Sequence, residues 1–306
     1  MEAQRPSALV ATHLPLPLFS QGKVRDTYEI DSERLLMVAT DRISAFDHVL
    51  PTGIPDRGKV LTQLSIYWFG QTMGFQENHL ISGMTPDLPA GVAAQRDELA
   101  GRFMIVRRAD RIDVECVVRG YLAGSAWSEY QETGAVAGVP LAPGLAQSQR
   151  LESPIFTPAS KEDSGHDQNI TFAELVQRVG SELASQLRDQ SLALYRYAAD
   201  LALTRGLILA DTKFEFGFLD GRLILIDEAL TPDSSRYWDA ALYRIGTSPE
   251  SYDKQFVRDW LSASGWDRES APPTLPEAIV EQTRQRYLTA YERIVGQPFF
   301  PPKERV

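Results

Sequence analysis

Four charged residues interrupt the apolar, strand-like runs GLILADTKFEFGF and LILIDE: Asp211, Lys213, Glu215 and Asp227. Alternate residues of a strand share a face, so the first three charges lie together. Mg²⁺ prefers oxygen ligands, usually one or two carboxylates plus phosphate oxygens of a substrate, and lysine offers phosphate a compact positive charge. The pattern indicates a metal–phosphate site in which the three carboxylates bind the metal. A solvated strand face with surface ion pairs would explain it equally well.

The turn between the two runs decides whether Asp227 joins that face. A three-residue loop over 219–221 with glycine in the left-handed position places Asp227 opposite Lys213. A two-residue turn over 220–221 places it opposite Phe214, on the other face. We predict the three-residue loop because it gathers all four charges.

Two glycine-containing segments resemble phosphate loops only weakly. GIPDRGKV, residues 53–60, nearly matches G-x-x-x-x-G-K-[ST], but Val60 stands where a hydroxyl should bind Mg²⁺, which excludes a standard P-loop. Gly58 and Lys59 before a helix could help bind an anion, although a simple helix-entry turn explains them better. SQGKVRD, residues 20–26, is a glycine turn with two cations, and by itself such a turn is usually only a turn.

Two arginines follow apolar strands and stand beside small polar residues. Arg119 and Ser125 flank a glycine bend in VVRGYLAGSAW, and Arg236 lies in TPDSSRYW. Arginine binds carboxylate or phosphate in a bidentate manner, so both are candidate anion contacts. A surface arginine and a helix-capping serine are the competing explanation. The four histidines show no metal-ligand spacing, and Cys116 within a strand pattern is expected to be a small core residue.

Composition narrows the class of protein. The 306 residues are 43% hydrophobic and 24% charged, with a net charge of −10, which argues against general affinity for nucleic acid or anionic membranes. No apolar run approaches the roughly 20 residues of a membrane helix, and no signal peptide is recognisable. One cysteine excludes an internal disulfide and fits a reducing compartment. We therefore expect a cytoplasmic protein.

The order of predicted elements positions these residues in an α+β fold with two lobes. We predict a hairpin, a helix and two strands in the first half, over residues 24–30 with 34–40, 60–73, 102–108 and 113–120. We place the lobe boundary near Asp110, giving a β-rich lobe 1–110 that carries the phosphate loop and an α+β lobe 111–306 that carries the metal and substrate site.

The second half is predicted to mix helices with the charged strand pair. Residues 142–169 form a long segment without periodicity, of the kind that is usually functional or disordered. Thr171 and Glu174 have capping-box spacing, and a long helix should run from there to Arg205, before Gly206. A final amphipathic helix is expected over 277–295.

Taken together, the segments resemble the SAICAR synthetases (phosphoribosylaminoimidazole-succinocarboxamide synthases) of purine biosynthesis, in their longer single-chain form. The resemblance runs from GKVRDTYEI to DSSRYW, and its most specific segments are VECVVRGYLAGSAW, LADTKFEFG and LIDEALTPDSSRYW. ATDRISAFD and TPASKEDSGHDQNI fit as well. The order of these motifs along one chain makes coincidence improbable.

The resemblance implies a fold and a reaction. The family fold is two-lobed α+β, with mostly antiparallel sheets, similar to ATP-grasp enzymes, and nucleotide lies in the cleft between the lobes. The reaction joins the carboxylate of carboxyaminoimidazole ribotide (CAIR) to the amine of L-aspartate, converting ATP to ADP and phosphate with Mg²⁺. We expect small-molecule substrates, no nucleic acid or membrane partner, and a monomer rather than an oligomer.

The resemblance also implies roles for individual residues. Lys213, Glu215 and Asp227 are the expected catalytic residues, and Glu215 with Asp227 matches the Mg²⁺ ligands. The expected ATP contacts are Gly22, Lys23, Val24 and Arg25 in the phosphate loop, Arg108 and Arg111 at the adenine hinge, and Lys213 and Glu215. The expected substrate contacts are Arg119, Ser125 and Arg236, with Lys161 and Asp167 in the long loop, and Ser44 and Asp47 as further candidates.

Three other functions share these features. Another ATP-dependent carboxylate–amine ligase would use the same scaffold, and a small-molecule kinase would turn over ATP fully without aspartate. A regulatory module that has lost catalysis would bind Mg-ATP and form no product.

Overall fold

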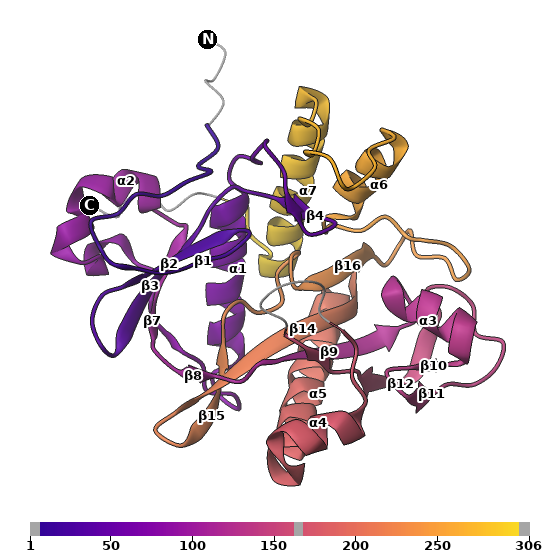
Figure 1. Ribbon diagram of the computed structural model, residues 1–306. Helices are drawn as coiled ribbons and strands as arrows, with labels where there is room; N and C mark the ends of the chain where they lie inside the picture. Colours follow the sequence, from indigo (N-terminus) through magenta and orange to yellow (C-terminus); the bar gives the residue numbers. More distant parts are fainter. Residues whose placement is uncertain (1–6, 162–167, 300–306) are drawn as a thin grey trace. The chain divides into compact units, whose positions relative to one another are not determined.

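The computed structural model describes residues 7–161 and 168–299, and the chain divides into two compact units (Figure 1). The first comprises Met1–Gln71, His79–Ala109 and Lys254–Val306, and the second comprises Thr72–Asn78 and Asp110–Asp253. The chain therefore passes from the first unit to the second at residues 109–110, where the lobe boundary was predicted. Residues 254–306, however, belong to the first unit with the N-terminal part of the chain. The division into lobes 1–110 and 111–306 stays a prediction.

The first unit is built on a five-stranded antiparallel sheet. The strand order is β1 (Leu18–Gln21), β2 (Arg25–Glu29), β3 (Arg34–Ala39), β7 (Phe103–Arg107) and β6 (Leu80–Ser82). The predicted hairpin around residues 31–33 is confirmed as β2 paired with β3. Its sharp turn follows from Asp31, whose carboxylate accepts hydrogen bonds from the backbone N–H groups of Glu33 and Arg34.

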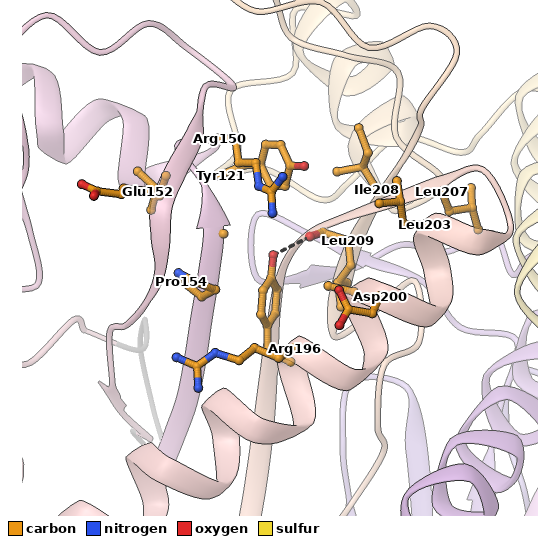
Figure 2. A pocket seen from close by; sticks show the side chains of 14 residues that line it. Tyr121, Arg150, Glu152, Pro154, Arg196, Asp200, Leu203, Leu207, Ile208 and Leu209 are labelled. Carbon is orange, nitrogen blue, oxygen red and sulfur yellow. Dashed lines mark hydrogen bonds between the residues drawn. The ribbon is translucent and has the colours of Figure 1, made fainter.

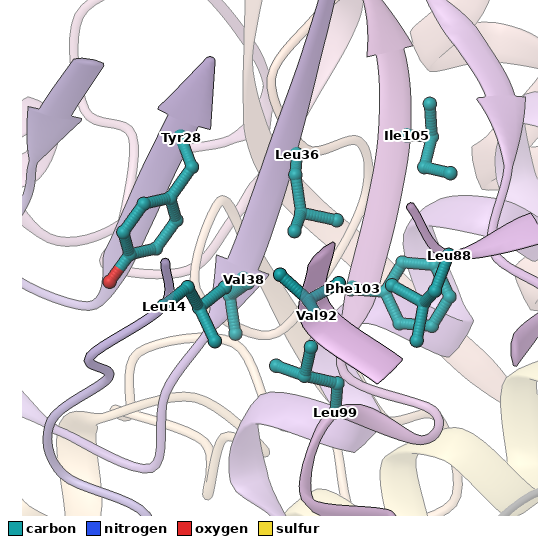
Figure 3. Packing of buried hydrophobic residues seen from close by; sticks show 9 residues of the cluster. All are labelled: Leu14, Tyr28, Leu36, Val38, Leu88, Val92, Leu99, Phe103 and Ile105. Atoms are coloured by element: carbon teal, nitrogen blue, oxygen red, sulfur yellow. The ribbon is translucent and has the colours of Figure 1, made fainter. Parts of the chain in front are cut away.

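Alternation along β3 and β7 buries one apolar face of this sheet. Leu36 and Val38 point to the same side as Phe103 and Ile105, and Tyr28 of β2 extends the row (Figure 3). The short helices η1 (Thr85–Asp87), η2 (Ala90–Gln95) and α2 (Arg96–Leu99) and the residue after η1 add Leu88, Val92 and Leu99 to this cluster, and Leu14 of the N-terminal segment completes it.

Three longer helices complete the first unit: α1 (Arg57–Thr72), α6 (Gln255–Ala263) and α7 (Glu277–Val295), with the two-residue strands β4 (Ser44–Ala45) and β5 (His48–Val49). The last helix has the predicted bounds. At the start of α1, the N–H of Gly58 donates to Oδ1 of Asp41 at 2.9 Å. A carboxylate of the protein thus occupies this helix start, so GIPDRGKV is a helix-entry turn and not an open anion site.

The second unit is a sheet centred on the long strand β14 (Leu207–Leu219). Its main order is β12 (Arg150–Phe156), β9 (Val114–Tyr121), β14 and β15 (Arg222–Ile226), all antiparallel. Three short strands pair along it: β8 (Asp110–Arg111) and β16 (Ser235–Asp239) with β14, and β13 (Ala159–Ser160) with β9. Helices α3 (Ser125–Thr133), α4 (Phe172–Val179) and α5 (Ser181–Thr204) and the hairpin β10 (Ala135–Val136)–β11 (Val139–Pro140) complete the unit.

The predicted three-residue turn between β14 and β15 is wrong. Leu219 pairs with Arg222, which leaves the two-residue turn Asp220–Gly221. Both turn residues have positive φ, 50° and 72°, as a type I′ turn requires. The twist of such a turn matches that of its flanking strands. The Asp-Gly turn preference therefore sets the register, even though the three-residue loop would have placed all four charges on one face.

Two other predictions about the second unit need correction. The segment over 142–169 is not structureless, because it contains β12 and β13. The helix from the confirmed Thr171–Glu174 capping box does not run unbroken to Arg205, since Gly180, at φ 85°, separates α4 from α5. Across the described residues, no helix is long and apolar enough to span a membrane.

Candidate active site

The two faces of β14 differ in their surroundings. Phe214 lies opposite Cys116 of β9, and the Cys116 thiol lies beside Ser191 of α5, so this face packs on the helix. Burial raises the pKa of the Cys116 thiol, as expected for a core residue. Asp211 and Lys213 lie on the opposite face of β14.

Lys213 is held by a glutamate of the neighbouring strand. Its ammonium group pairs with Oε1 of Glu115, a buried residue of β9. Burial alone would lower the pKa of Lys213, but the attraction of Glu115, Glu215 and Glu228 outweighs burial and raises it. The lysine therefore stays protonated, with a fixed direction on the charged face. Glu115 was not predicted, although its spacing from Arg119 in VECVVRG already places both on one strand face.

Glu215 and Asp227 lie close enough to affect one another. The pKa of Glu215 is raised, first by burial and then by the negative charge of Asp227, while Lys161 and Lys213 oppose the rise. By strict alternation the observed register would turn Asp227 away. Asp227 instead follows the end of β15 and has a left-handed backbone, at φ 64°, which breaks the alternation.

The chemistry of this pair suits a hard divalent cation only in part. Two carboxylates match the one or two that proteins usually offer Mg²⁺. Among the described residues, however, no three histidine, cysteine or acidic side chains gather as a metal site. The predicted third ligand, Asp211, is four residues from Glu215 along an extended strand, and it binds arginine. This geometry favours Glu215 and Asp227 as the metal ligands, and a third ligand at Asp211 stays a prediction.

Two arginines share the carboxylate of Asp211. Nη1 of Arg236 donates to Asp211 Oδ2 at 3.0 Å, and Nη1 of Arg119 lies 3.7 Å from the same oxygen. Arg119 also donates from Nε to Thr157 Oγ1 at 3.0 Å, and Arg236 Nε lies 3.7 Å from Asp253. These contacts fix both guanidinium groups. Neither Thr157 nor Asp253 was predicted from the sequence.

The two guanidinium groups are electrostatically different. Burial and the neighbouring Arg236 lower the pKa of Arg119, and Asp211 opposes this. For Arg236, burial is outweighed by Asp211 and Asp253, and its pKa is raised. Ser125 is exposed at the first position of α3. The preceding Gly124 has φ 59°, and a Cβ there would lie 2.7 Å from the Arg236 guanidinium nitrogens, so glycine lets the arginine approach the helix start.

The predicted phosphate loop is a tight turn in the first unit. The N–H of Gly22 donates to the carbonyl of Arg25 at 2.7 Å, and Thr40 N–H donates to the carbonyl of Val24. Lys23 pairs with Asp47, so these two predicted residues are together. The guanidinium of Arg42, which was not predicted, donates to the carbonyls of Gly22 and Lys23 and thereby fixes the loop.

The remaining predicted residues are engaged locally. Lys254 Nζ lies 3.5 Å from the Ser44 hydroxyl, and Arg108 pairs with Glu29 at 3.1 Å. In the second unit, Arg111 pairs with Asp113 at 2.7 Å, and Lys161 pairs with Glu215. Asp167 lies outside the described residues.

A cavity of about 300 Å³ lies elsewhere in the second unit (Figure 2). It is lined by the start of β14, by β12, by the end of β9 and by residues 195–203 of α5. The Tyr195 hydroxyl, which also lines it, donates to the Leu209 carbonyl at 2.7 Å. Between the pairs Arg150–Tyr121 and Ile155–Arg119 the register of strand β12 shifts, and residues of this irregular stretch line the cavity together with Gly120. None of the predicted site residues that the structure describes lines this cavity.

Comparisons with known proteins agree with one another. The SAICAR synthetase family model matches residues 18–273. A phosphoribosylaminoimidazole-succinocarboxamide synthase of Rhodopirellula baltica is 52% identical, covering 95% of this chain and 96% of the relative. The SAICAR synthase of Saccharomyces cerevisiae, solved in complex with SAICAR, is 42% identical with a TM-score of 0.88, covering 95% of this chain and 99% of that one. A SAICAR synthetase solved in complex with ADP is 25% identical with a TM-score of 0.68, covering 92% and 99%. The α+β chain described here belongs to the SAICAR synthetase family.

Proposed function

We propose that the charged face of β14 is the active site of an ATP-dependent ligase. The reaction joins the carboxylate of CAIR to the amine of L-aspartate and yields SAICAR, ADP and phosphate in purine biosynthesis. The observation that carries the proposal is the arrangement of Arg119 and Arg236 around Asp211, on the same strand face as the Lys213–Glu115 ion pair. Two similar solved structures support the proposal: the Saccharomyces cerevisiae SAICAR synthase was solved with SAICAR, and another SAICAR synthetase was solved with ADP.

The chemistry requires activation of a poor acyl donor. Phosphoryl transfer from ATP to the CAIR carboxylate forms an acyl phosphate, and the aspartate amine then attacks its carbonyl carbon and displaces phosphate. Lys213, kept protonated by Glu115, and Lys23 neutralise charge on the transferred phosphoryl group. Arg119 and Arg236 orient the ribotide, so that positioning contributes much of the rate.

Glu215 and Asp227 are the proposed holders of Mg²⁺, which when bound neutralises phosphate oxygens. The proposed ATP contacts are Gly22, Lys23, Val24, Arg25, Arg108, Arg111, Lys213 and Glu215. The proposed substrate contacts are Ser44, Asp47, Arg119, Ser125, Lys161, Asp167 and Arg236. A monomer in the cytoplasm remains our expectation.

The substitution Glu215→Gln tests the assignment. We expect it to lower kcat by at least about 100-fold, of the order seen when one group that stabilises transition-state charge is removed. The assay is ADP release with Mg-ATP, CAIR and L-aspartate, omitting each in turn. Glu152→Gln, at the separate cavity, is the matched control and should leave the rate unchanged. Unchanged kinetics in the Glu215 variant would exclude the metal assignment, and ADP release without aspartate would favour a kinase.

A further inference from the structure

Two residues with different proposed ligands bind one another. The ammonium group of Lys161 pairs with Oε2 of Glu215, and their side chains are 24% and 9% exposed. Lys161 is a proposed substrate contact, and Glu215 is a proposed metal ligand. While the ammonium group of Lys161 holds Oε2, that oxygen is not open to a divalent cation, so Lys161 competes with a cation that would bind there.

The carboxylate pair needs a nearby positive charge. Glu215 is buried and lies near the negative charge of Asp227. Lys161 pairs with Glu215 directly, and Lys213 is the next positive charge beside it. Lys161 therefore supplies the neutralising charge that a divalent cation would also supply.

The local backbone lets the Lys161 side chain move without moving the strand. Ser160 and Ala159 pair with Val114 and Glu115 of β9. On the other side, Ser160 N–H donates to the carbonyl of Gln168 at 2.9 Å. The residue before Lys161 is thus hydrogen-bonded on both sides, whereas the lysine side chain is a flexible four-carbon stem that reorients by rotation alone.

We propose that Lys161 is a positioning residue that stands in for the divalent cation at Glu215 and Asp227. When the cation binds, Lys161 leaves Glu215 and pairs with an anionic group of the ribotide. This inference rests on the function proposed above. It implies that the cation and the ribotide each strengthen the binding of the other. Binding of the cation releases Lys161 from Glu215, and the released Lys161 can then pair with the ribotide.

Titration with Mn²⁺ alone tests the competition. Free Mn²⁺ is measured by electron paramagnetic resonance at pH 8 with the unaltered protein and with Lys161→Met. Removing the competing ammonium group should tighten Mn²⁺ binding about 10-fold, the equivalent of one charged hydrogen bond. Arg188→Met is the charge-matched control, because the ion pair of Arg188 is with its neighbour Asp189 on α5. This control variant should bind Mn²⁺ like the unaltered protein.

Glu215→Gln separates failure of this inference from failure of the proposed function. If Glu215→Gln weakens Mn²⁺ binding while Lys161→Met leaves it unchanged or weaker, the role of Lys161 is refuted and the metal assignment stands. If Glu215→Gln has no effect on Mn²⁺, both are refuted. Lys161→Gln repeats the test should the methionine variant not fold. As a second readout, Mn²⁺ should strengthen CAIR binding in the unaltered protein and lose this effect in either lysine variant.

Discussion

The substitution Gly58→Ala tests whether GIPDRGKV is a structural turn or a phosphate loop. A Cβ at Gly58 would lie 2.2 Å from the carbonyl oxygen of Ala39 and 2.8 Å from that of Thr40. Ordinary contact begins near 3.4 Å, so α1 would have to move by more than 1 Å from the end of β3. The obstructing atoms belong to the backbone, which rotamer changes cannot relieve.

The expected cost follows from this geometry. Overpacking a close-packed site costs typically about 1–3 kcal/mol, and displacement of α1 also strains the bond from Gly58 N–H to Asp41. We expect a loss of at least about 2 kcal/mol, against total stabilities of roughly 5–15 kcal/mol. Urea unfolding followed by circular dichroism measures it. Gly70→Ala in the same helix has nothing within 4 Å of the added Cβ, and it should gain about 0.5–1 kcal/mol.

A third variant separates stability from phosphate binding. Lys59 lies 3.8 Å from Asp56, within the turn. Lys59→Met should leave the KM for ATP unchanged within about twofold, because the lysine is assigned no ligand and Asp56 keeps its closer pair with Arg284, at 2.7 Å. A stable Gly58→Ala variant, or a Lys59→Met variant with a strongly raised KM for ATP, would refute the interpretation of this segment as structural.

Two further predictions concern single carboxylates. Asp211→Asn should leave Mn²⁺ affinity within about threefold of the unaltered protein, because only long-range attraction is lost, whereas loss of a direct ligand would weaken it far more. Asp26 is buried and pairs with Arg42 at 2.7 Å; burial would raise its pKa, but the arginine and Thr12 outweigh burial and lower it below 3.8. Its ionised form therefore adds stability above pH 3.8 that is lost as the pH falls through the lower folded value, and acid-unfolding curves of Asp26→Asn should lack this component.

The sequence predicted helices and strands well where the residues that determine the element all lie within one short segment. The capping box at Thr171 and the helix over 277–295 depend on neighbouring residues, and both occur as expected. The break at Gly180 was missed because periodicity continues across it, and only the left-handed backbone reveals it. Strand β12 was missed because its bulge and proline interrupt the alternation on which strand prediction depends.

The candidate site was harder to predict because its pairs join distant segments. Glu115 and Lys213 come from different strands and meet through sheet register. Strand alternation placed Asp211 and Glu215 on one face, yet a shared face does not mean a shared ligand, and the strand separates them by four residues. Asp227 reaches Glu215 through a positive φ, which a residue pattern does not encode.

The paired cations explain how a chain of net charge −10 can hold anionic substrates. In the second unit, four cations proposed to contact ATP or the ribotide pair with a largely buried carboxylate: Lys213 with Glu115, Lys161 with Glu215, and Arg119 and Arg236 with Asp211. Such carboxylates offset the desolvation of buried cations and fix their direction, but they also compete with any incoming anion. An anionic substrate must therefore displace the carboxylate that already pairs with each cation. Selectivity then depends on matching several fixed cations at once, and the overall charge of the protein matters little to it.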